Sequence, residues 1–287
     1  MKQKQKGIFF ILGAACCFAG MNLFVRLAGD LPVMQKVFFR NLIAMFAAAA
    51  VLIKNKESFH AGKGNHIYLF LRAFIGLLGV ILNFYAIDRM NIADASMLNK
   101  LSPFFAVIFS IFILKEKAKP VEWGFILLAF GGALFVIKPE FGMEAVPALC
   151  GTLGGMCAGA AYTFVRLLSK RGERGKLIVF YFSAFSCLVT GPVMLLGFQP
   201  MEGWQIWSLL GAGCSAAGGQ FCITAAYAHA PAKDISVFDY SQVIFAALMG
   251  YLFLGQMPDV YSWIGYMIIA GAAIGKWKYI QMKEKNT

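Results

Sequence analysis

The sequence predicts an all-α integral membrane protein, with ten transmembrane helices arranged as two inverted five-helix repeats. Three observations predict this fold class: an apolar composition, recurring apolar stretches of about 20 residues, and residue matches at one fixed offset. Of the 287 residues, 60% are hydrophobic and 14% are charged, whereas soluble domains are nearer half apolar and a quarter charged. An α-helix of about 20 residues crosses the roughly 30 Å hydrocarbon core of a bilayer. The short alternating segments of a membrane β-barrel are absent from the sequence.

The same residues recur 140 positions apart along most of the chain. The stretch Phe24–Leu27 (FVRL) returns as Phe164–Leu167. Further matching pairs are Cys17 with Cys157, Ala86 with Ala226, Asp94 with Asp234, Phe105 with Phe245, Ala106 with Ala246, Leu114 with Leu254, Trp123 with Trp263 and Gly131 with Gly271. An ungapped register of this length indicates a duplicated unit, so we predict a first repeat over residues 1–142 and a second over 143–287.

Each predicted repeat holds five apolar helices. The expected spans are 7–27, 33–53, 66–88, 92–114, 119–138, 147–169, 177–197, 204–228, 232–254 and 259–279. Because five is an odd number, the second repeat enters the membrane upside down relative to the first. Inverted repeats of this kind enclose a site near the midplane, and exchanging their conformations opens that site to one side and then to the other.

The basic residues predict how the chain is oriented. The predicted segments on the side of the N-terminus hold 18 lysines and arginines, and the opposite edges hold four. Such a bias places both termini in the cytoplasm and makes the chain a multi-pass protein of the cell membrane, in contact with the lipid bilayer. The net charge of +12 could suggest nucleic acid, but no nucleic-acid partner is expected because the charges lie in short loops beside apolar helices. The apolar run after Lys2, Lys4 and Lys6 is too long for a cleavable signal.

Two local patterns predict irregular or close packing. Pro103 is expected to kink the helix over 92–114 beside Lys100, since proline removes a backbone hydrogen bond. Its counterpart is Val243, so no matching kink is expected in the second repeat. Gly151, Gly155 and Gly159 recur at intervals of four, which predicts a helix face that allows close approach of a neighbour.

Several short stretches carry a resemblance to a known family. They are Phe38–Arg40, Ala93–Ala95, Leu114–Lys117, Ile137–Pro139 and Phe180–Ser183. Together with the inverted repeat they make the chain similar, over essentially its whole length, to the drug/metabolite transporter superfamily in its ten-helix form of two EamA-type repeats. The resemblance implies an alternating-access carrier with a central cavity and with its fifth and tenth helices toward the periphery. It implies no particular solute, and Gly255-Gln256 departs from the acidic residue that the family often has there.

Charges within the predicted helices are the main candidates for a site. A charge at the bilayer centre costs roughly 2.5–3.5 kcal/mol, so Arg40, Lys100 and Asp239 are expected to face water, a partner or a substrate. Asp239 matches Asn99 in the repeat, and Tyr240 matches Lys100. Because the repeat brings these stretches together, we predict that Lys100 and Asp239 line one cavity. The alternative is a structural ion pair that tethers the two halves.

These residue types suggest roles in binding. Lys100 could pair with a carboxylate or phosphate of the substrate, and Asp239 could hold an ammonium or take a proton, which makes Asp239 the candidate for proton coupling. Arg40 could contact an anion or extend to the interface. Asn83, Gln220 and Tyr240 complete the predicted substrate-binding set, with hydrogen bonding between helices as their alternative role. The other arginines near helix ends, Arg26, Arg72 and Arg166, are expected to extend to the interface.

The sequence favours a carrier over other functional classes. The seven cysteines form no C-x-x-C pair and the three histidines no cluster, so no metal, cofactor or catalytic residue is expected. Without a P-loop, transport would be driven by a proton or exchange gradient. We expect a secondary transporter that moves a small-molecule substrate, an amino acid, related metabolite or drug, with export expected from the resemblance. The alternatives are an uptake or exchange carrier for an anionic metabolite, a membrane-embedded enzyme acting on lipid, and a channel. The oligomeric state, including a homodimer, is left open.

Overall fold

The computed structural model describes residues 2–115, 120–137, 145–229 and 236–285. In these residues the regular structure is entirely helical. The helices are α1 (Lys2–Leu27), α2 (Val33–Lys54), α3 (His66–Arg89), α4 (Ile92–Asn99), α5 (Ser102–Ile113), α6 (Pro120–Ile137), α7 (Ala145–Lys170), α8 (Gly175–Leu196), α9 (Gly203–His229), the 3-10 helix η1 (Ser236–Tyr240), α11 (Ser241–Leu254) and α12 (Val260–Lys285). This arrangement confirms the predicted all-helical membrane fold.

The helices have the length and surface of membrane spans. Among the described residues, nine spans are long and apolar enough to cross a bilayer, with α4 and α5 counted together as one span and η1 and α11 as another. The span outside this set is α12, in which Tyr261, Trp263 and Tyr266 reduce the hydropathy. Large apolar side chains such as Leu196, at 92% exposure, and Phe9, at 74%, lie on the outside. Such a surface requires an apolar surrounding.

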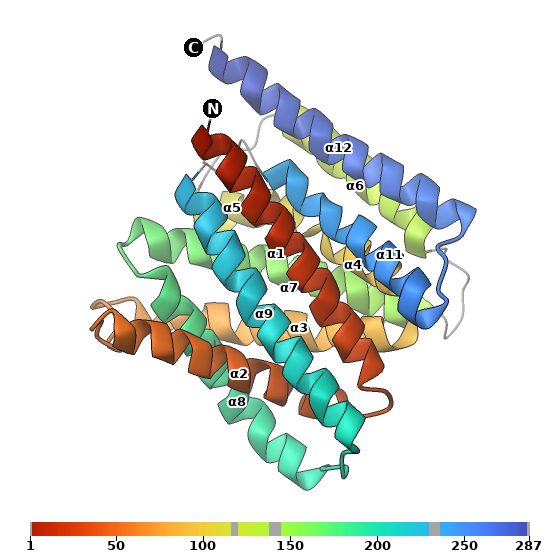
Figure 1. Cartoon of the computed structure of the whole chain (residues 1–287). Helices are drawn as coiled ribbons and strands as arrows, with labels where there is room; N and C mark the ends of the chain where they lie inside the picture. The colour runs from red at the N-terminus through yellow and green to blue at the C-terminus, as the bar shows by residue number, and fades with distance from the viewer. Residues whose placement is uncertain (1, 116–119, 138–144, 230–235, 286–287) are drawn as a thin grey trace.

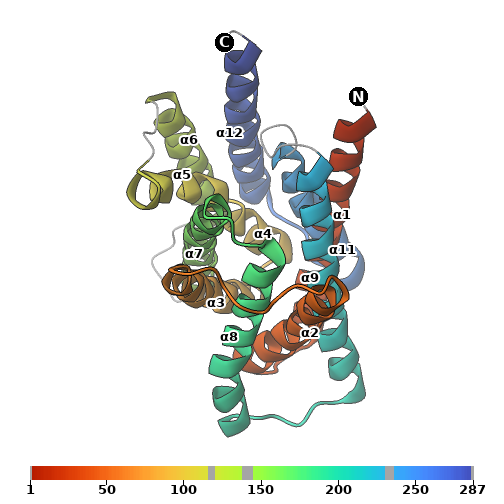
Figure 2. The same cartoon turned by 90° about the vertical axis from the view of Figure 1, so that its left-hand side faces the viewer.

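In Figure 1 α1, α9 and α12 run diagonally while α3 and α7 lie closer to horizontal, and the helices pair across the two halves of the chain. Helix α1 packs along α9, and α3 packs along α7. Each of these pairs maps onto the other if α1 corresponds to α7 and α3 to α9, as an internal twofold relation requires. Helix α2 pairs with α8, and α6 pairs with α12 at one edge of the bundle, which Figure 2 shows from the side. The division at residue 142 remains a prediction.

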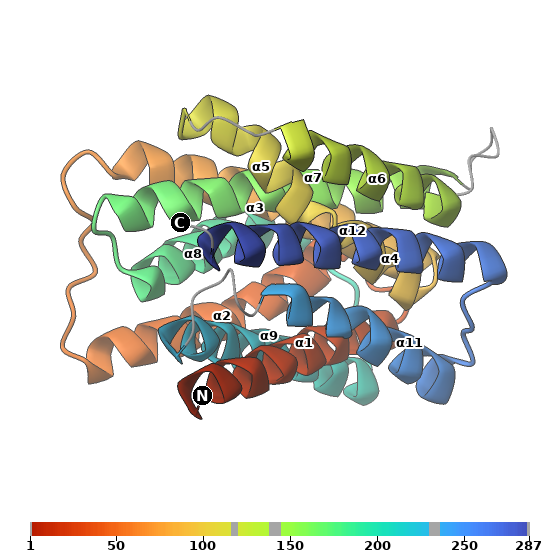
Figure 3. The ribbon, with the colours of Figure 1, turned by 90° about the horizontal axis from the view of Figure 1, so that it is seen from above.

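Both chain ends lie at the same end of the bundle, together with the loop between α2 and α3 (Figure 3). We call this end the termini end. The opposite end, where α1 turns into α2 and α11 into α12, we call the far end.

The predicted helix over 92–114 is divided into α4 and α5 at Lys100 and Leu101. Pro103 lies in the first turn of α5, so the break follows from its missing N–H. The second repeat has a matching junction, because η1 gives way to α11 between Tyr240 and Ser241. The expectation that the second repeat would lack such an irregularity is therefore wrong. No proline causes this junction. Contacts with Lys100, described below, hold it in place.

The glycines of α7 allow the close packing that their spacing predicts. A Cβ added to Gly155 would lie 2.7 Å from the carbonyl oxygen of Leu98, and one added to Gly159 would lie 2.6 Å from that of Ser102. The backbone of α7 therefore rests directly on the α4–α5 junction. This contact fixes the junction on one side of the cavity described next.

Candidate substrate cavity

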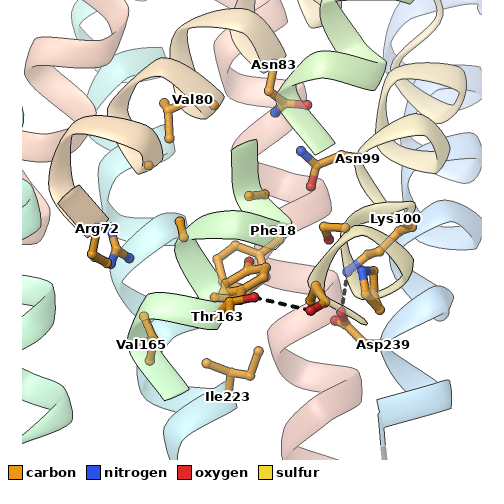
Figure 4. Close-up of a pocket in the computed structure, with 18 of the residues that line it drawn as sticks. Phe18, Arg72, Val80, Asn83, Asn99, Lys100, Thr163, Val165, Ile223 and Asp239 are labelled. Carbon is orange, nitrogen blue, oxygen red and sulfur yellow. Dashed lines mark hydrogen bonds and ion pairs between the residues drawn. The ribbon is translucent and has the colours of Figure 1, made fainter. Parts of the chain in front are cut away.

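A cavity of about 660 Å³ lies between the two halves of the chain. Residues of α1 to α9, η1 and α11 line it, and α6 contributes only Glu122. The polar lining residues are Asn22, Arg40, Arg72, Asn83, Asn99, Lys100, Ser102, Ser110, Glu122, Tyr162, Thr163, Arg166, Gln220, Asp239 and Gln242. Apolar side chains such as Phe18, Val80 and Ile223 complete the wall (Figure 4). A polar interior inside an apolar exterior is the arrangement expected of a solute-binding site.

Lys100 and Asp239 line this cavity, as the sequence predicts, and they also pair with each other. Lys100 Nζ donates to Asp239 Oδ2, and the two side chains are 9% and 21% exposed. Tyr240 OH donates to the carbonyl oxygen of Lys100 at 2.9 Å. The two helix junctions are therefore bound to each other by an ion pair and a hydrogen bond. The pair therefore lines the cavity, as predicted, and also links the two predicted repeats, whereas its contact with a substrate stays a prediction.

Five of the six predicted substrate-binding residues line the cavity: Arg40, Asn83, Lys100, Gln220 and Asp239. The sixth, Tyr240, is not among the lining residues, because its hydroxyl is directed at the Lys100 carbonyl. One oxygen each of Asn83 and Asp239, the Oδ1 atoms, is buried without a hydrogen-bond partner. Contact of these residues with a substrate remains a prediction.

Arg72 is a cavity residue that the sequence reasoning missed. It was expected to extend to the interface, but it is only 9% exposed and its guanidinium lies over the ring of Phe182, with Cζ 4.0 Å from the ring centroid. Arg40 approaches the same ring, at 5.9 Å. Gly76, one turn after Arg72, leaves room for the arginine to fold inward. The pairing of Arg72 with a glycine four residues later was a signal for this orientation.

The cavity reaches toward the termini end. Its lining there includes Leu114, Glu122, Val165 and Arg166, which lie at or near the ends of α5, α6 and α7. Arg166 is exposed and lines the cavity, so its position agrees with the expected place near a helix end.

At the far end, polar contacts join α1, α2 and α3 in a cluster that we call the far-end gate: Arg26, Lys36 and Asp88. Lys36 Nζ lies 2.6 Å from Asp88 Oδ1 and 2.7 Å from the carbonyl oxygen of Gly29. Arg26 Nη1 donates to the carbonyl oxygens of Ile87, at 3.0 Å, and of Asp88. The positive charges of Arg26 and Lys36 also interact favourably with the partial negative charge at the C-terminal end of α3.

One sequence expectation at the far end is wrong, and one charge there is more buried than its place at a membrane edge suggests. Lys36 lies at the edge where the sequence places it, and it is fully buried. Arg26 was expected to extend to the interface, but it is bound to the end of α3. Both residues lie at the predicted membrane edge, where sequence cannot distinguish a free charge from one that a neighbouring helix binds.

At the termini end, the α2–α3 and α7–α8 loops are joined by polar contacts. Glu173 accepts hydrogen bonds from the Gly62 N–H at 2.9 Å and from Asn65 Nδ2 at 3.0 Å. Burial of Glu173 opposes its ionisation, but these hydrogen bonds outweigh that effect and lower the pKa of its carboxyl group. Lys176 Nζ pairs with Glu57 Oε1 at 2.9 Å. Each loop comes from a different predicted repeat.

The EamA-like transporter family matches this chain twice, over residues 5–138 and over residues 148–275. The chain therefore belongs to the EamA-like transporter family and is a membrane transport protein rather than an enzyme. The pseudopaline exporter CntI of Pseudomonas aeruginosa is 32% identical over 273 residues, covering 94% of this chain and 95% of that protein. Human solute carrier family 35 member G1 is 29% identical over 292 residues, covering 94% of this chain and 80% of the relative.

Two further similarities bear on fold and relationship. A riboflavin transporter of Vibrio cholerae is 29% identical over 219 residues, covering 72% of this chain and 71% of that protein. A solved crystal structure covers 99% of both chains with a TM-score of 0.66 at 15% sequence identity. At that identity the solved structure supports the fold alone.

Proposed function

We propose that this protein is a secondary transporter that exports a small polar organic solute across the cell membrane by alternating access. The observation that carries the proposal is a polar cavity between the two halves that reaches toward the termini end while the contacts of the far-end gate are formed. A carrier must expose its site to one side at a time, and inverted repeats provide two equivalent conformations for this purpose.

The proposed direction follows from orientation and relationship. The excess of basic residues in the loops at the termini end favours a cytoplasmic location for that end. The cavity described here would then be accessible from the cytoplasm, ready to load a solute for export. The relative at 32% identity is an exporter, which supports the same direction. The alternative is an uptake or exchange carrier for an anionic metabolite, with Arg40 and Lys100 binding the anion.

Asp239 is the proposed coupling residue. Its carboxylate pairs with Lys100 at the point where the two helix junctions meet, so protonation of Asp239 would release the link between the halves. An amino acid or related solute could replace the same link, with its carboxylate on Lys100 and its ammonium group on Asp239. Both events act on a contact between the halves, which is where a conformational change must begin.

The test uses purified protein in proteoliposomes. Vesicles are loaded with a defined mixture of amino acids, carboxylates and nucleosides, and efflux is followed by mass spectrometry with and without the same solutes outside. A carrier accelerates efflux when its solute is present on the opposite side, whereas a channel or an enzyme does not. The proposal is wrong if no member of a broadened mixture shows such acceleration. Asp239→Asn should transport without dependence on pH, and full pH dependence in that variant would exclude the proton role.

A further inference from the structure

Arg40 and Arg72 carry hydrogen-bond donors that no described group of the protein accepts. Their side chains are buried, with residue exposures of 6% and 9%. Nε of both arginines and Nη1 of Arg72 are buried without a hydrogen-bond partner, whereas Nη1 of Arg40 donates to Asn41 Oδ1 at 2.8 Å. Buried charges are normally paired, because an unpaired one loses its hydration without compensation. Unpaired cationic donors on a cavity wall therefore favour the binding of an anion there.

The guanidinium groups of Arg40, on α2, and Arg72, on α3, lie near the same aromatic ring. This ring belongs to Phe182 on α8, and both arginines contact it. A Cβ added to Gly76 would lie 2.8 Å from Arg72 Nη1 and 3.1 Å from Phe182. Arg72 thus occupies a slot that a glycine keeps open and an aromatic ring covers. A site with this much support differs from a chance approach of two long side chains.

The described residues supply fewer acidic than basic groups to the cavity wall. Among the described lining residues, four are cationic (Arg40, Arg72, Lys100 and Arg166) and two are acidic (Glu122 and Asp239). Asp239 is already bound to Lys100, and Glu122 lies on α6 in the part of the cavity near the termini end. The field at Arg40 and Arg72 is therefore positive, and it favours an anion from outside the chain.

We propose that Arg40 and Arg72 form an oxyanion-binding subsite, and that the transported solute carries a carboxylate held there. This proposal rests on the proposed transport function and names its substrate class. The planar fork of a guanidinium matches a carboxylate through two parallel hydrogen bonds. Figure 4 shows Arg72 on the opposite side of the cavity from the Lys100–Asp239 pair, with Phe18 between them. A solute with a carboxylate at one end and a second charged group at the other would contact both places.

The proposal is tested by binding to the purified full-length protein in detergent micelles. The probes are glutarate, its uncharged diamide and inorganic phosphate, and the readouts are the thermal midpoint and Kd by titration. Glutarate should raise the midpoint, and the diamide should not. Arg40→Gln and Arg72→Gln should each weaken glutarate binding by about 10- to 100-fold, the range for losing charged hydrogen bonds. Arg89→Gln, an exposed arginine on α3 outside the cavity lining, is the matched control.

Two further variants separate geometry from charge. Arg72→Lys keeps the charge and loses the fork, so it should bind glutarate less tightly than the parent and more tightly than Arg72→Gln. Gly76→Ala keeps both arginines and fills the slot, so it should weaken binding as well. Equal binding by the parent and by all four variants would overturn the proposal.

A purely structural role for Arg72 gives the opposite stability result. If Arg72 serves to bind an anion, Arg72→Gln should raise the thermal midpoint measured in the absence of glutarate or phosphate, because the substitution removes a buried unpaired charge. A lowered midpoint together with unchanged glutarate binding would show a structural role. Binding of phosphate without glutarate would overturn the carboxylate assignment. If counterflow reveals only uncharged solutes, this inference fails and the transport function stands, whereas no counterflow of any solute refutes the function itself.

Discussion

Asp88→Asn should open the far end of the molecule. The change removes the negative partner of Lys36, whose side chain has no exposure and lies 2.6 Å from Asp88 Oδ1. Breaking a buried ion pair by removing one partner costs about 3–5 kcal/mol. We expect about 2 kcal/mol here, because Lys36 keeps the Gly29 carbonyl and the asparagine amide oxygen can still accept a hydrogen bond. That cost falls on the closed far end, so the ratio of open to closed molecules should rise about 30-fold.

The opening can be measured as a distance between two spin labels in a cysteine-free background. Arg89 at the end of α3 and Phe198 in the α8–α9 loop are exposed positions for the labels. The loop is tied to α2, since Gln35 exchanges hydrogen bonds with Gln199 at 3.0 and 3.1 Å. The pair therefore reports the separation of α3 from α2. Asp88→Asn should add a longer distance to the distribution.

Two further variants test whether the ion pair causes this change. The apolar double variant Lys36→Met with Asp88→Leu should restore the single short distance, because well-packed apolar residues can replace a buried pair. Asp30→Asn removes an exposed carboxylate of the neighbouring loop that acts on Lys36 more weakly than Asp88 does, and it should have a much smaller effect. The reasoning is refuted if Asp88→Asn keeps the parent distribution, or if Asp30→Asn changes it as much.

Three other outcomes are expected. Gly159→Ala should lower the thermal midpoint, because the added Cβ has an overpacking cost of about 1–3 kcal/mol. Gly131→Ala is the control and should leave the midpoint unchanged, since a Cβ added there has no neighbour within 4 Å. Equal midpoints for the two variants would contradict the close contact of Gly159 with Ser102. Tyr240→Phe should lose about 1 kcal/mol of stability while keeping transport, as measured by unfolding and counterflow, and a loss of transport alone would place the hydroxyl in the site. Because the pKa of Glu173 is lowered in the folded protein, its ionised carboxylate stabilises the loop contact. This stabilisation is fully present above pH 4.5, the usual pKa of a glutamate, and is lost as the pH falls through the lowered pKa. The protection of amides in residues 58–65 against hydrogen exchange, relative to the intrinsic exchange rate at each pH, should therefore fall below pH 4.5 in the parent protein, and Glu173→Gln should remove that dependence of protection on pH.

The helical membrane fold was predictable because its causes are local and strong. Long apolar stretches must become helices in lipid, and the 140-residue offset exposes the duplication directly. Lys100 and Asp239 were predictable for a related reason, since an intramembrane charge is costly and the repeat places both near the same axis. These inferences needed only composition, spacing and symmetry.

The remaining features depend on contacts between distant segments. Lys36 and Asp88 are 52 positions apart, and each alone is a charge near a helix end. Arg72 faces inward because Gly76 and Phe182 accept it, and Phe182 comes from the other half of the chain. The junction at Tyr240 contains no helix-breaking residue and is fixed by Lys100. Local sequence carries little information on such contacts.

Basic residues that match at the 140-residue offset lie in different surroundings in the two repeats. Arg26 donates hydrogen bonds to the last carbonyl groups of α3. The residue that matches it in the second repeat, Arg166, lines the cavity. Lys36 and Lys176 also match at the 140-residue offset. Lys36 is buried and paired with Asp88, whereas Lys176 pairs with Glu57 in the α2–α3 loop. A single conformation thus places matching residues of the two repeats in different surroundings. Exchanging the surroundings within each matched pair describes the second conformation that the proposed alternating-access cycle requires.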